Sequence, residues 1–270
     1  MPARRIWWDR GVNSAVRIFE TSTGLPAVVV PVMGASSELT LAGVAQAAAA
    51  GPDVIEWRLD SLVSASGTHD AQGALDLLPR VIETAAGVRV LATFRSHAEG
   101  GPGERADEPY GVLLRSLATS GLVHGIDCEL SRPEPAVRDA ITLARAAGVA
   151  VIGSSHHFDR TPESSELDEI FAALAQRRSQ VLKVATMPHD VADVWRLLAA
   201  ARRAQVELGL AVLPIAMGSL GVITRIAGES FGSPATFGSV GKGSAPGQVE
   251  IGALRSQLAA FHTSLTGQGS

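Results

Sequence analysis

The stretch SQVLKVATMP, residues 179–188, decides the fold. The residues that flank Lys183, at 181–182 and 184–185, are all apolar and lack the alternation with polar residues that a half-exposed strand shows. Such a run predicts a strand buried on both faces, as in parallel sheets that helices cover. Lys183 interrupts the run, although a charged amine is costly to bury without a partner.

Other short apolar runs resemble this one, and helix-like stretches separate most of them. The helix-like stretches, at 37–50, 71–86, 133–147 and 165–178, repeat apolar residues at a spacing close to that of a helix turn. Eight strands alternating with helices in a chain of 270 residues predict an α/β fold, a (β/α)8 TIM barrel formed as a single domain. An open doubly wound sheet is the alternative, which local patterns do not exclude. The eight runs begin at Ala27, Asp53, Val88, His124, Val149, Gln180, Leu208 and Pro234.

The composition is that of a soluble globular protein, with 46% hydrophobic and 19% charged residues. A formal net charge of −4 argues against a nucleic-acid partner, which would favour a basic surface. We expect no membrane partner, because no apolar stretch approaches the roughly 18–20 residues of a membrane span and the start does not resemble a secretory signal. Cys128 is the only cysteine, which excludes an intrachain disulfide and favours the reducing cytoplasm. No metal site is predicted, since the seven histidines include no ligand pair at i and i+4.

Ionisable residues gather at the C-terminal ends of the runs, where the active sites of such barrels lie. In VIEWRLD, residues 54–60, Glu56, Arg58 and Asp60 alternate and therefore point to one side of a strand. Taken singly, such residues are usually solvated loop residues or helix caps, and Asp127 could be such a cap. Their convergence on one face predicts a shared cleft with perturbed pKa values. The other members of the set are Arg95, Glu99, Asp127, Glu129, His156, His157 and Arg225.

The chain contains only two lysines, Lys183 and Lys242, and uses arginine everywhere else. A buried lysine is more often a structural ion-pair partner than a reactive group. However, an amine whose pKa is lowered by desolvation and nearby guanidinium groups can attack a carbonyl and form an imine, which arginine cannot do. We therefore expect an imine-forming lysine, with His156 or His157 as its proton shuttle. The spacing leaves open which of the two histidines faces inward.

Two short motifs suggest other chemistry but fail. GESFG, residues 228–232, matches the nucleophile elbow of serine hydrolases, but neither a helix pattern nor an aspartate follows Ser230. GKGS, residues 241–244, lacks the Ser or Thr that follows the lysine of a phosphate-binding loop. The segment at 238–248 is rich in Gly and Ser and indicates either a lid or an ordinary flexible connection.

From about Ala27 to the C-terminal helix, the sequence resembles the type I 3-dehydroquinate dehydratases. The resemblance rests on short motifs in matching order and spacing: EWRLD, TFRSHAEGG, IDCEL, SSHHF followed by TP, VLKVATMP, AMGSLGVITRI, FGSPATF and SAPGQ. It implies a (β/α)8 barrel that converts 3-dehydroquinate to 3-dehydroshikimate and water in the shikimate pathway of aromatic amino acid biosynthesis. It also implies that the reaction needs no cofactor and no metal.

The resemblance further implies a role for each matched residue. Lys183 would form the imine with the C3 ketone of the substrate and act as the electron sink. His156 would move the protons, and Glu99 would orient His156. Arg225 would bind the substrate carboxylate. The remaining matches would help Arg225 from the lid (Ser244, Gln248), hold the ring hydroxyls (Glu56, Arg58, Arg95) or form apolar walls (Phe158, Met217).

Two positions depart from the family pattern. His157 follows the shuttle histidine where members usually have Asp or Asn, and Ile215 stands where many have a second methionine. Family members are often dimers, so we expect a homodimer. Residues 1–24 carry no resemblance, and we interpret them as an N-terminal extension that covers the bottom of the barrel, with the catalytic barrel at 25–270.

Two other functions remain open. A class I aldolase on a similar barrel would share the imine lysine but need not share the residues placed to bind a carboxylate. A non-catalytic barrel that binds a cyclic hydroxy acid would keep the pocket, but the presence of both Lys183 and His156 argues against it.

Overall fold

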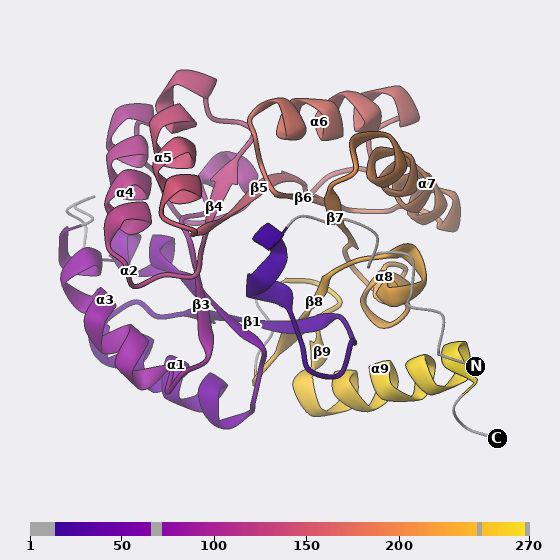
Figure 1. The fold of residues 1–270 in the computed structure, drawn as a ribbon, viewed down its shortest axis with the longest axis horizontal. Helices are drawn as coiled ribbons and strands as arrows, with labels where there is room; N and C mark the ends of the chain where they lie inside the picture. Colours follow the sequence, from indigo (N-terminus) through magenta and orange to yellow (C-terminus); the bar gives the residue numbers. More distant parts are fainter. Residues whose placement is uncertain (1–13, 66–71, 242–244, 268–270) are drawn as a thin grey trace.

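A computed structural model describes residues 14–65, 72–241 and 245–267. Parallel strands follow one another round a ring, and helices cover its outside (Figure 1). Sheet neighbours are also sequence neighbours from β1 to β7, and β8 pairs with β1. This order excludes the doubly wound sheet, in which the strand order reverses, and confirms the predicted single-domain (β/α)8 barrel.

Every predicted run contains a strand, and every predicted helix-like stretch contains a helix. The short strand β9, which pairs with β8, was not predicted. None of the described helices is both long and apolar enough to cross a bilayer. The strands are β1 (Ala27–Met33), β2 (Val54–Arg58), β3 (Arg89–Thr93), β4 (Gly125–Glu129), β5 (Ala150–His157), β6 (Val181–Thr186), β7 (Ala211–Ala216), β8 (Ala235–Ser239) and β9 (Val249–Glu250). The α-helices are α1 (Ser37–Ala49), α2 (Leu59–Ala65), α3 (Gln72–Thr84), α4 (Asp107–Thr119), α5 (Glu134–Ala146), α6 (Ser164–Gln176), α7 (Val191–Leu208), α8 (Val222–Ile226) and α9 (Ile251–Thr266), and the 3-10 helices are η2 (Ser14–Phe19), η3 (His97–Glu99) and η4 (Gly228–Phe231).

The strands are buried on both faces, which explains their continuous apolar runs. Alternate residues, such as Val29 and Leu91, point into the ring and form an inner cluster. The residues between them, such as Trp57 and Leu182, pack against the surrounding helices. The same alternation turns the polar residues near the C-terminal ends of the strands inward, toward one common space.

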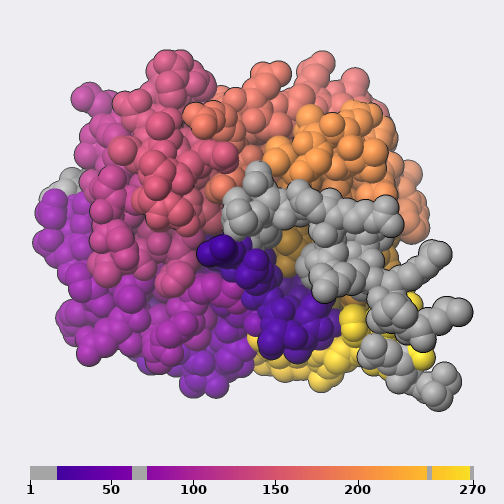
Figure 2. Space-filling model, in the orientation of Figure 1, coloured from indigo at the N-terminus to yellow at the C-terminus, as the bar shows by residue number. Residues whose placement is uncertain are grey.

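The helix η2 lies at the N-terminal end of the barrel and appears in indigo at the centre of Figures 1 and 2. Ile18 and Phe19 are buried and belong to the inner cluster. A Cβ atom on Gly125, the first residue of β4, would lie 2.7 Å from Cδ1 of Ile18, so a larger residue there would displace the Ile18 side chain. The boundary of the extension at residue 24 stays a prediction, and residues 1–13 lie outside the described residues.

The outer cluster gives a test of the packing. Phe171 on α6 is fully buried, so Phe171→Ala should lower the free energy of unfolding by about 3–5 kcal/mol through lost contacts and an internal cavity. Val206→Ala on the exposed face of α7 is the control and should change it by less than about 0.5 kcal/mol. Urea denaturation followed by circular dichroism measures both, and equal losses would contradict the assigned core.

Candidate active site

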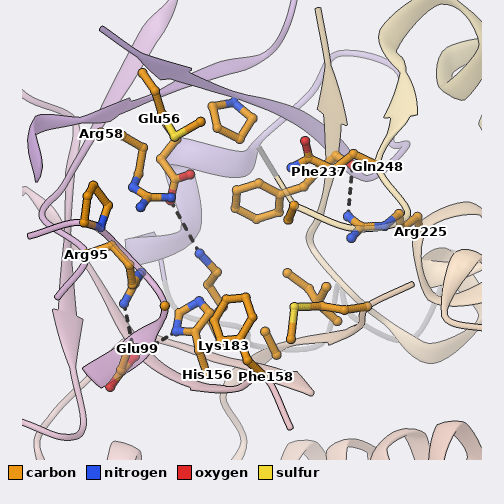
Figure 3. A pocket seen from close by; sticks show the side chains of 18 residues that line it. Glu56, Arg58, Arg95, Glu99, His156, Phe158, Lys183, Arg225, Phe237 and Gln248 are labelled. Carbon is orange, nitrogen blue, oxygen red and sulfur yellow. Dashed lines mark hydrogen bonds and ion pairs between the residues drawn. The ribbon is translucent and has the colours of Figure 1, made fainter. Parts of the chain in front are cut away.

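A pocket opens at the C-terminal ends of the strands (Figure 3). Apolar side chains, among them Met33, Ile215 and Phe237, form part of its wall. Every residue to which the family resemblance gives a role lines it except Ser244, which lies outside the described residues. Four other members of the converging ionisable set are not among the lining residues: Asp60, Asp127, Glu129 and His157. The predicted residues brought together are Glu56, Arg58, Arg95, Glu99, His156, Phe158, Lys183, Met217, Arg225 and Gln248.

Lys183 extends from β6 into this pocket and is only 4% exposed. Its Nζ lies 3.4 Å from Glu56 Oε1, 3.7 Å from Asp127 Oδ2 and 4.5 Å from the centre of the Phe237 ring. The sequence interpretation placed guanidinium groups beside this amine. The structure places two carboxylates next to it, and the guanidinium of Arg95 contacts the same oxygen of Asp127. A carboxylate at this distance can accept the proton that the amine must lose before it attacks a carbonyl.

Strand alternation settles which histidine faces inward. His156 lines the pocket, and its Nδ1 lies 2.8 Å from Glu99 Oε2. Because the Glu99 carboxylate accepts a hydrogen bond from Nδ1–H, the proton of the neutral ring is on Nδ1, and Nε2 is left as the free base. Burial, together with the charges of Arg95 and Lys183, lowers the pKa of His156 well below its usual range, which keeps the ring neutral at physiological pH. His157 is not among the lining residues, and its Nε2 lies 3.1 Å from Ser155 Oγ.

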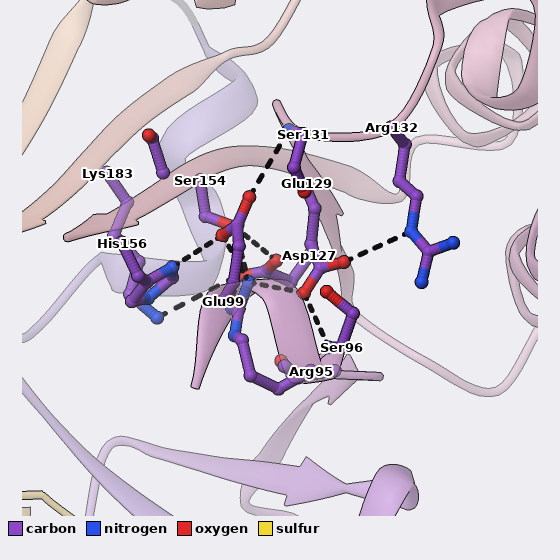
Figure 4. Close-up of polar contacts among 12 residues, drawn as sticks. Arg95, Ser96, Glu99, Asp127, Glu129, Ser131, Arg132, Ser154, His156 and Lys183 are labelled. Atoms are coloured by element: carbon purple, nitrogen blue, oxygen red, sulfur yellow. Dashed lines mark hydrogen bonds and ion pairs between the residues drawn. The ribbon is translucent and has the colours of Figure 1, made fainter. Parts of the chain in front are cut away.

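Arg95 is the hub of a buried network (Figure 4). Its Nη1 donates to Glu99 Oε2 at 3.2 Å, to Glu129 Oε1 at 3.2 Å and to Ser154 Oγ at 2.9 Å. Its Nη2 donates to Asp127 Oδ2 at 2.8 Å. Burial opposes the charge, but the three carboxylates hold the pKa of Arg95 well above its usual range. Arg95 therefore neutralises its carboxylate neighbours, a role that the sequence analysis did not foresee; its contact with the ring hydroxyls stays a prediction.

The sequence analysis included Asp127 and Glu129 in the converging set of ionisable residues without giving them a role, and it missed Ser154 and Phe237. Asp127 is fully buried in β4, so the interpretation as a helix cap is wrong. Although burial opposes it, Arg95 and Lys183 lower the pKa of Asp127 to about 2. The alternating acids of GIDCEL were a usable signal for this residue and for Glu129, whereas Ser154 and Phe237 carried none.

The two predicted residues of β2 also have protein partners. Glu56 Oε1 accepts a hydrogen bond from Thr93 Oγ1 at 3.1 Å, besides its contact with Lys183. Arg58 donates to both carboxylate oxygens of Asp60, at 2.8 and 2.9 Å. Within the described ranges, no three His, Cys, Asp or Glu side chains converge in a way that could hold a metal ion.

Arg225 on α8 presents a buried positive charge to the pocket. It is 2% exposed and donates to two carbonyl oxygens, those of Phe237 and Pro246, each at 3.2 Å. No carboxylate pairs with it among the described residues, and Nε has no partner. Burial lowers the pKa of Arg225 to about 10, so the group remains charged at neutral pH. In Figure 3 it lies across the pocket from Arg95 and Glu99, where it is suited to bind an anionic group of a ligand.

The chain matches one protein family in sequence, and solved members of that family share its fold. The family profile described as type I 3-dehydroquinase matches residues 28–264. A 3-dehydroquinate dehydratase of Lactiplantibacillus plantarum is 34% identical over 243 residues, which are 90% of this chain and 95% of the relative. The crystal structure of 3-dehydroquinate dehydratase from Geobacillus kaustophilus aligns with a TM-score of 0.83 and 31% identity, over 88% of this chain and 91% of that one. The type I enzyme of Clostridium difficile, solved with covalently modified comenic acid, gives a TM-score of 0.83 and 29% identity, over 89% of this chain and 94% of that one.

The Arg95 network gives a second prediction. Arg95→Met leaves three buried carboxylates without their cation and should cost about 3–5 kcal/mol of stability. Arg138→Met, which breaks an exposed pair with Glu134, is the control and should leave stability nearly unchanged.

The pH dependence of stability separates this explanation from a simple packing defect. The folded-state pKa of Asp127, about 2, lies below its ordinary value, so its stabilising effect is present above that ordinary value and is lost as the pH falls through 2. In Arg95→Met, protonation instead relieves the unpaired carboxylates, so stability relative to the wild type should recover as the pH falls. A difference that stayed constant with pH in thermal denaturation would contradict the assigned role.

Proposed function

The chain belongs to the type I 3-dehydroquinase family, which catalyses the dehydration of 3-dehydroquinate in the shikimate pathway, and we propose that it does so through an imine on Lys183. One observation carries the mechanism. A buried primary amine lies beside a carboxylate and a neutral, oriented histidine, in a pocket whose opposite side presents the unpaired guanidinium of Arg225. An amine, a base and an anion site are what an imine-forming dehydratase of a keto acid needs.

The first step attaches the substrate. Lys183 Nζ gives up a proton and attacks the C3 ketone, the ketone oxygen leaves as water, and an iminium ion remains. Of the two carboxylates beside the amine, Asp127 is a poor proton acceptor, because the positive charges of Arg95 and Lys183 lower its pKa to about 2. Glu56, at 3.4 Å, is therefore the group assigned to take the proton.

The second step eliminates water. His156 Nε2 removes a proton from C2, and the electrons move into the iminium ion to give an enamine. The enamine electrons return as the C1–O bond breaks, and His156 gives its proton to the departing hydroxyl, so a C1=C2 double bond forms. A water molecule then hydrolyses the product iminium ion, which restores the C3 ketone and the free lysine. The balance is one substrate converted to one product and one water.

Arg225 binds the carboxylate on C1 in this proposal. A carboxylate there satisfies donors that the protein leaves unpaired and holds the substrate with its leaving hydroxyl near His156. Gln248 and Ser244 assist from the loop, Glu56, Arg58 and Arg95 hold the ring hydroxyls, and Phe158 and Met217 enclose the ring. An aldolase has no need for a buried arginine at this place, which favours the dehydratase over that alternative.

The setting of the enzyme is part of the proposal. We propose a homodimer in the cytoplasm whose partner is the small-molecule substrate, without nucleic acid and without a membrane. The net charge of −4 and the single cysteine support the last points. Residues 1–24 are proposed as the extension that covers the bottom of the barrel, which the burial of Ile18 and Phe19 supports.

The imine is tested by trapping. Borohydride added to enzyme turning over 3-dehydroquinate should reduce the iminium ion and leave a stable adduct, detected by intact mass and mapped by peptide digestion. Because the chain has only two lysines, the map must place the adduct on Lys183 rather than Lys242. Lys183→Met should lose both the adduct and turnover, whereas Lys242→Met is the control for trapping. Turnover without any adduct would overturn the imine mechanism.

The shuttle is tested with the adjacent histidines as a matched pair. His156→Ala should lower kcat by at least about 100-fold, the usual contribution of a general base, and should still yield a borohydride adduct, since imine formation precedes proton transfer. His157→Ala should keep kcat within a few-fold, because its ring does not line the pocket. The reverse result would assign the shuttle to His157.

A further inference from the structure

A second hollow lies at the opposite end of the barrel from the active site. Its lining comes from η2 and from the N-terminal ends of strands β3 to β6, and its volume is about 580 Å³. We call it the basal hollow. It is lined by Arg17, Ile18, Arg89, Gly121, Val123, His124, Arg145, Ala147, Gly148, Val149, Ala150 and Gln180.

The described lining of the basal hollow contains basic residues without acidic ones. The basic residues include three arginines, Arg17, Arg89 and Arg145. None of the three forms an ion pair with a described acidic residue, although the chain as a whole has a net charge of −4. Like charges gathered in one concavity repel one another, and an anion that binds among them relieves this repulsion.

The polar side chains of the basal hollow also keep only donors for a ligand. The backbone N–H of Val90 donates to His124 Nδ1 at 3.1 Å, so in the neutral ring the proton is on Nε2. The backbone N–H of Val151 donates to Gln180 Oε1 at 2.8 Å, which leaves the amide NH₂ of Gln180 as a donor. The acceptor atoms of His124 and Gln180 are thus occupied by backbone N–H groups, and their own N–H groups remain available to a ligand.

Two of the three arginines, Arg89 and Arg145, are positioned by backbone carbonyl oxygens. Arg89 donates to the carbonyl oxygens of Arg17 and Glu20, at 2.5 and 2.7 Å, and so ties η2 to β3. Arg145 donates to the carbonyl oxygen of Arg178 at 3.2 Å. Each guanidinium has five N–H donors, so donors remain on both after these bonds form. Fixed guanidinium groups bind phosphate and carboxylate through paired hydrogen bonds.

We propose that the basal hollow is a binding site for a small oxyanion, a metabolite that carries phosphate or carboxylate groups. The donor-only lining and the uncompensated arginines carry this inference, and it does not depend on the proposed mechanism. The volume lies within the range of small-molecule sites. The net charge of −4 disfavours long polyanions such as nucleic acids, because the rest of the surface repels them.

The test is isothermal titration of the full chain with inorganic pyrophosphate and, separately, with citrate, at matched ionic strength. We expect saturable binding at one site by at least one probe. Arg17→Gln and Arg145→Gln should each weaken it at least about tenfold, as expected for a lost charge-assisted hydrogen bond. Arg138→Gln, also on α5 but paired with Glu134 on the helix surface, is the control and should leave it unchanged. Arg89 is avoided because its loss would detach η2.

A further variant distinguishes binding in the basal hollow from binding in the active site. Arg225→Met removes the anion-binding group of the active site, so binding that persists in this variant belongs to the basal hollow. Binding of pyrophosphate alone would assign phosphoryl ligands, and binding of citrate alone would assign carboxylates. No saturable binding of either probe up to about 10 mM would overturn the proposal. So would binding that Arg225→Met abolishes, or binding that neither Arg17→Gln nor Arg145→Gln weakens.

Discussion

The chemistry of this barrel depends on one buried guanidinium. Arg95 contacts Asp127, Glu129 and Glu99, and without it three carboxylates would share an apolar interior. Two of these acids also contact the proposed catalytic groups: Glu99 holds the ring of His156, and Asp127 lies beside Lys183. Arg95 thus fixes the carboxylates, and they in turn fix the base and the amine. The positions of Lys183 Nζ and of the His156 ring therefore depend on Arg95, because it neutralises the carboxylates that they contact.

Because side chains alternate between the two faces of a strand, every second residue points into the barrel, and the character of these inward residues changes along each strand. Inward positions near the N-terminal ends are apolar, as at Val54 and Ile152, and two residues further along they become polar, as at Glu56 and Ser154. One barrel therefore contains an apolar layer that supports the fold and a polar layer that performs the chemistry. The parallel register brings the polar positions to a similar height, since Ser154 pairs with Lys183 and Glu129 pairs with Ser154.

The sequence predicted the elements and most of the pocket because these depend on local pattern and on motifs. Eight apolar runs became eight strands, and Lys183, His156 and Arg225 meet in one pocket. The partners of Lys183 were not predictable, since Glu56 lies far from it in sequence and meets it only when the ring of strands forms. Spacing alone also left open which of His156 and His157 faces inward, and only the family resemblance favoured His156. Adjacent residues of a strand point to opposite faces, and the phase of the alternation depends on the register with β6.

The distribution of charge explains why substrate binding and fold stability do not compete in this pocket. Arg95, Lys183 and Arg58 each have a carboxylate partner supplied by the protein, so their burial is compensated in the folded chain. Arg225 has only carbonyl oxygens among the described residues, and burial lowers its pKa to about 10. Among the described residues, the charges beside the proposed catalytic groups thus have carboxylate partners, and the guanidinium that we propose binds the substrate has none. In the proposed mechanism, a substrate carboxylate adds the missing partner to charges that the protein already holds in place, so we expect binding to require little rearrangement of the proposed catalytic groups.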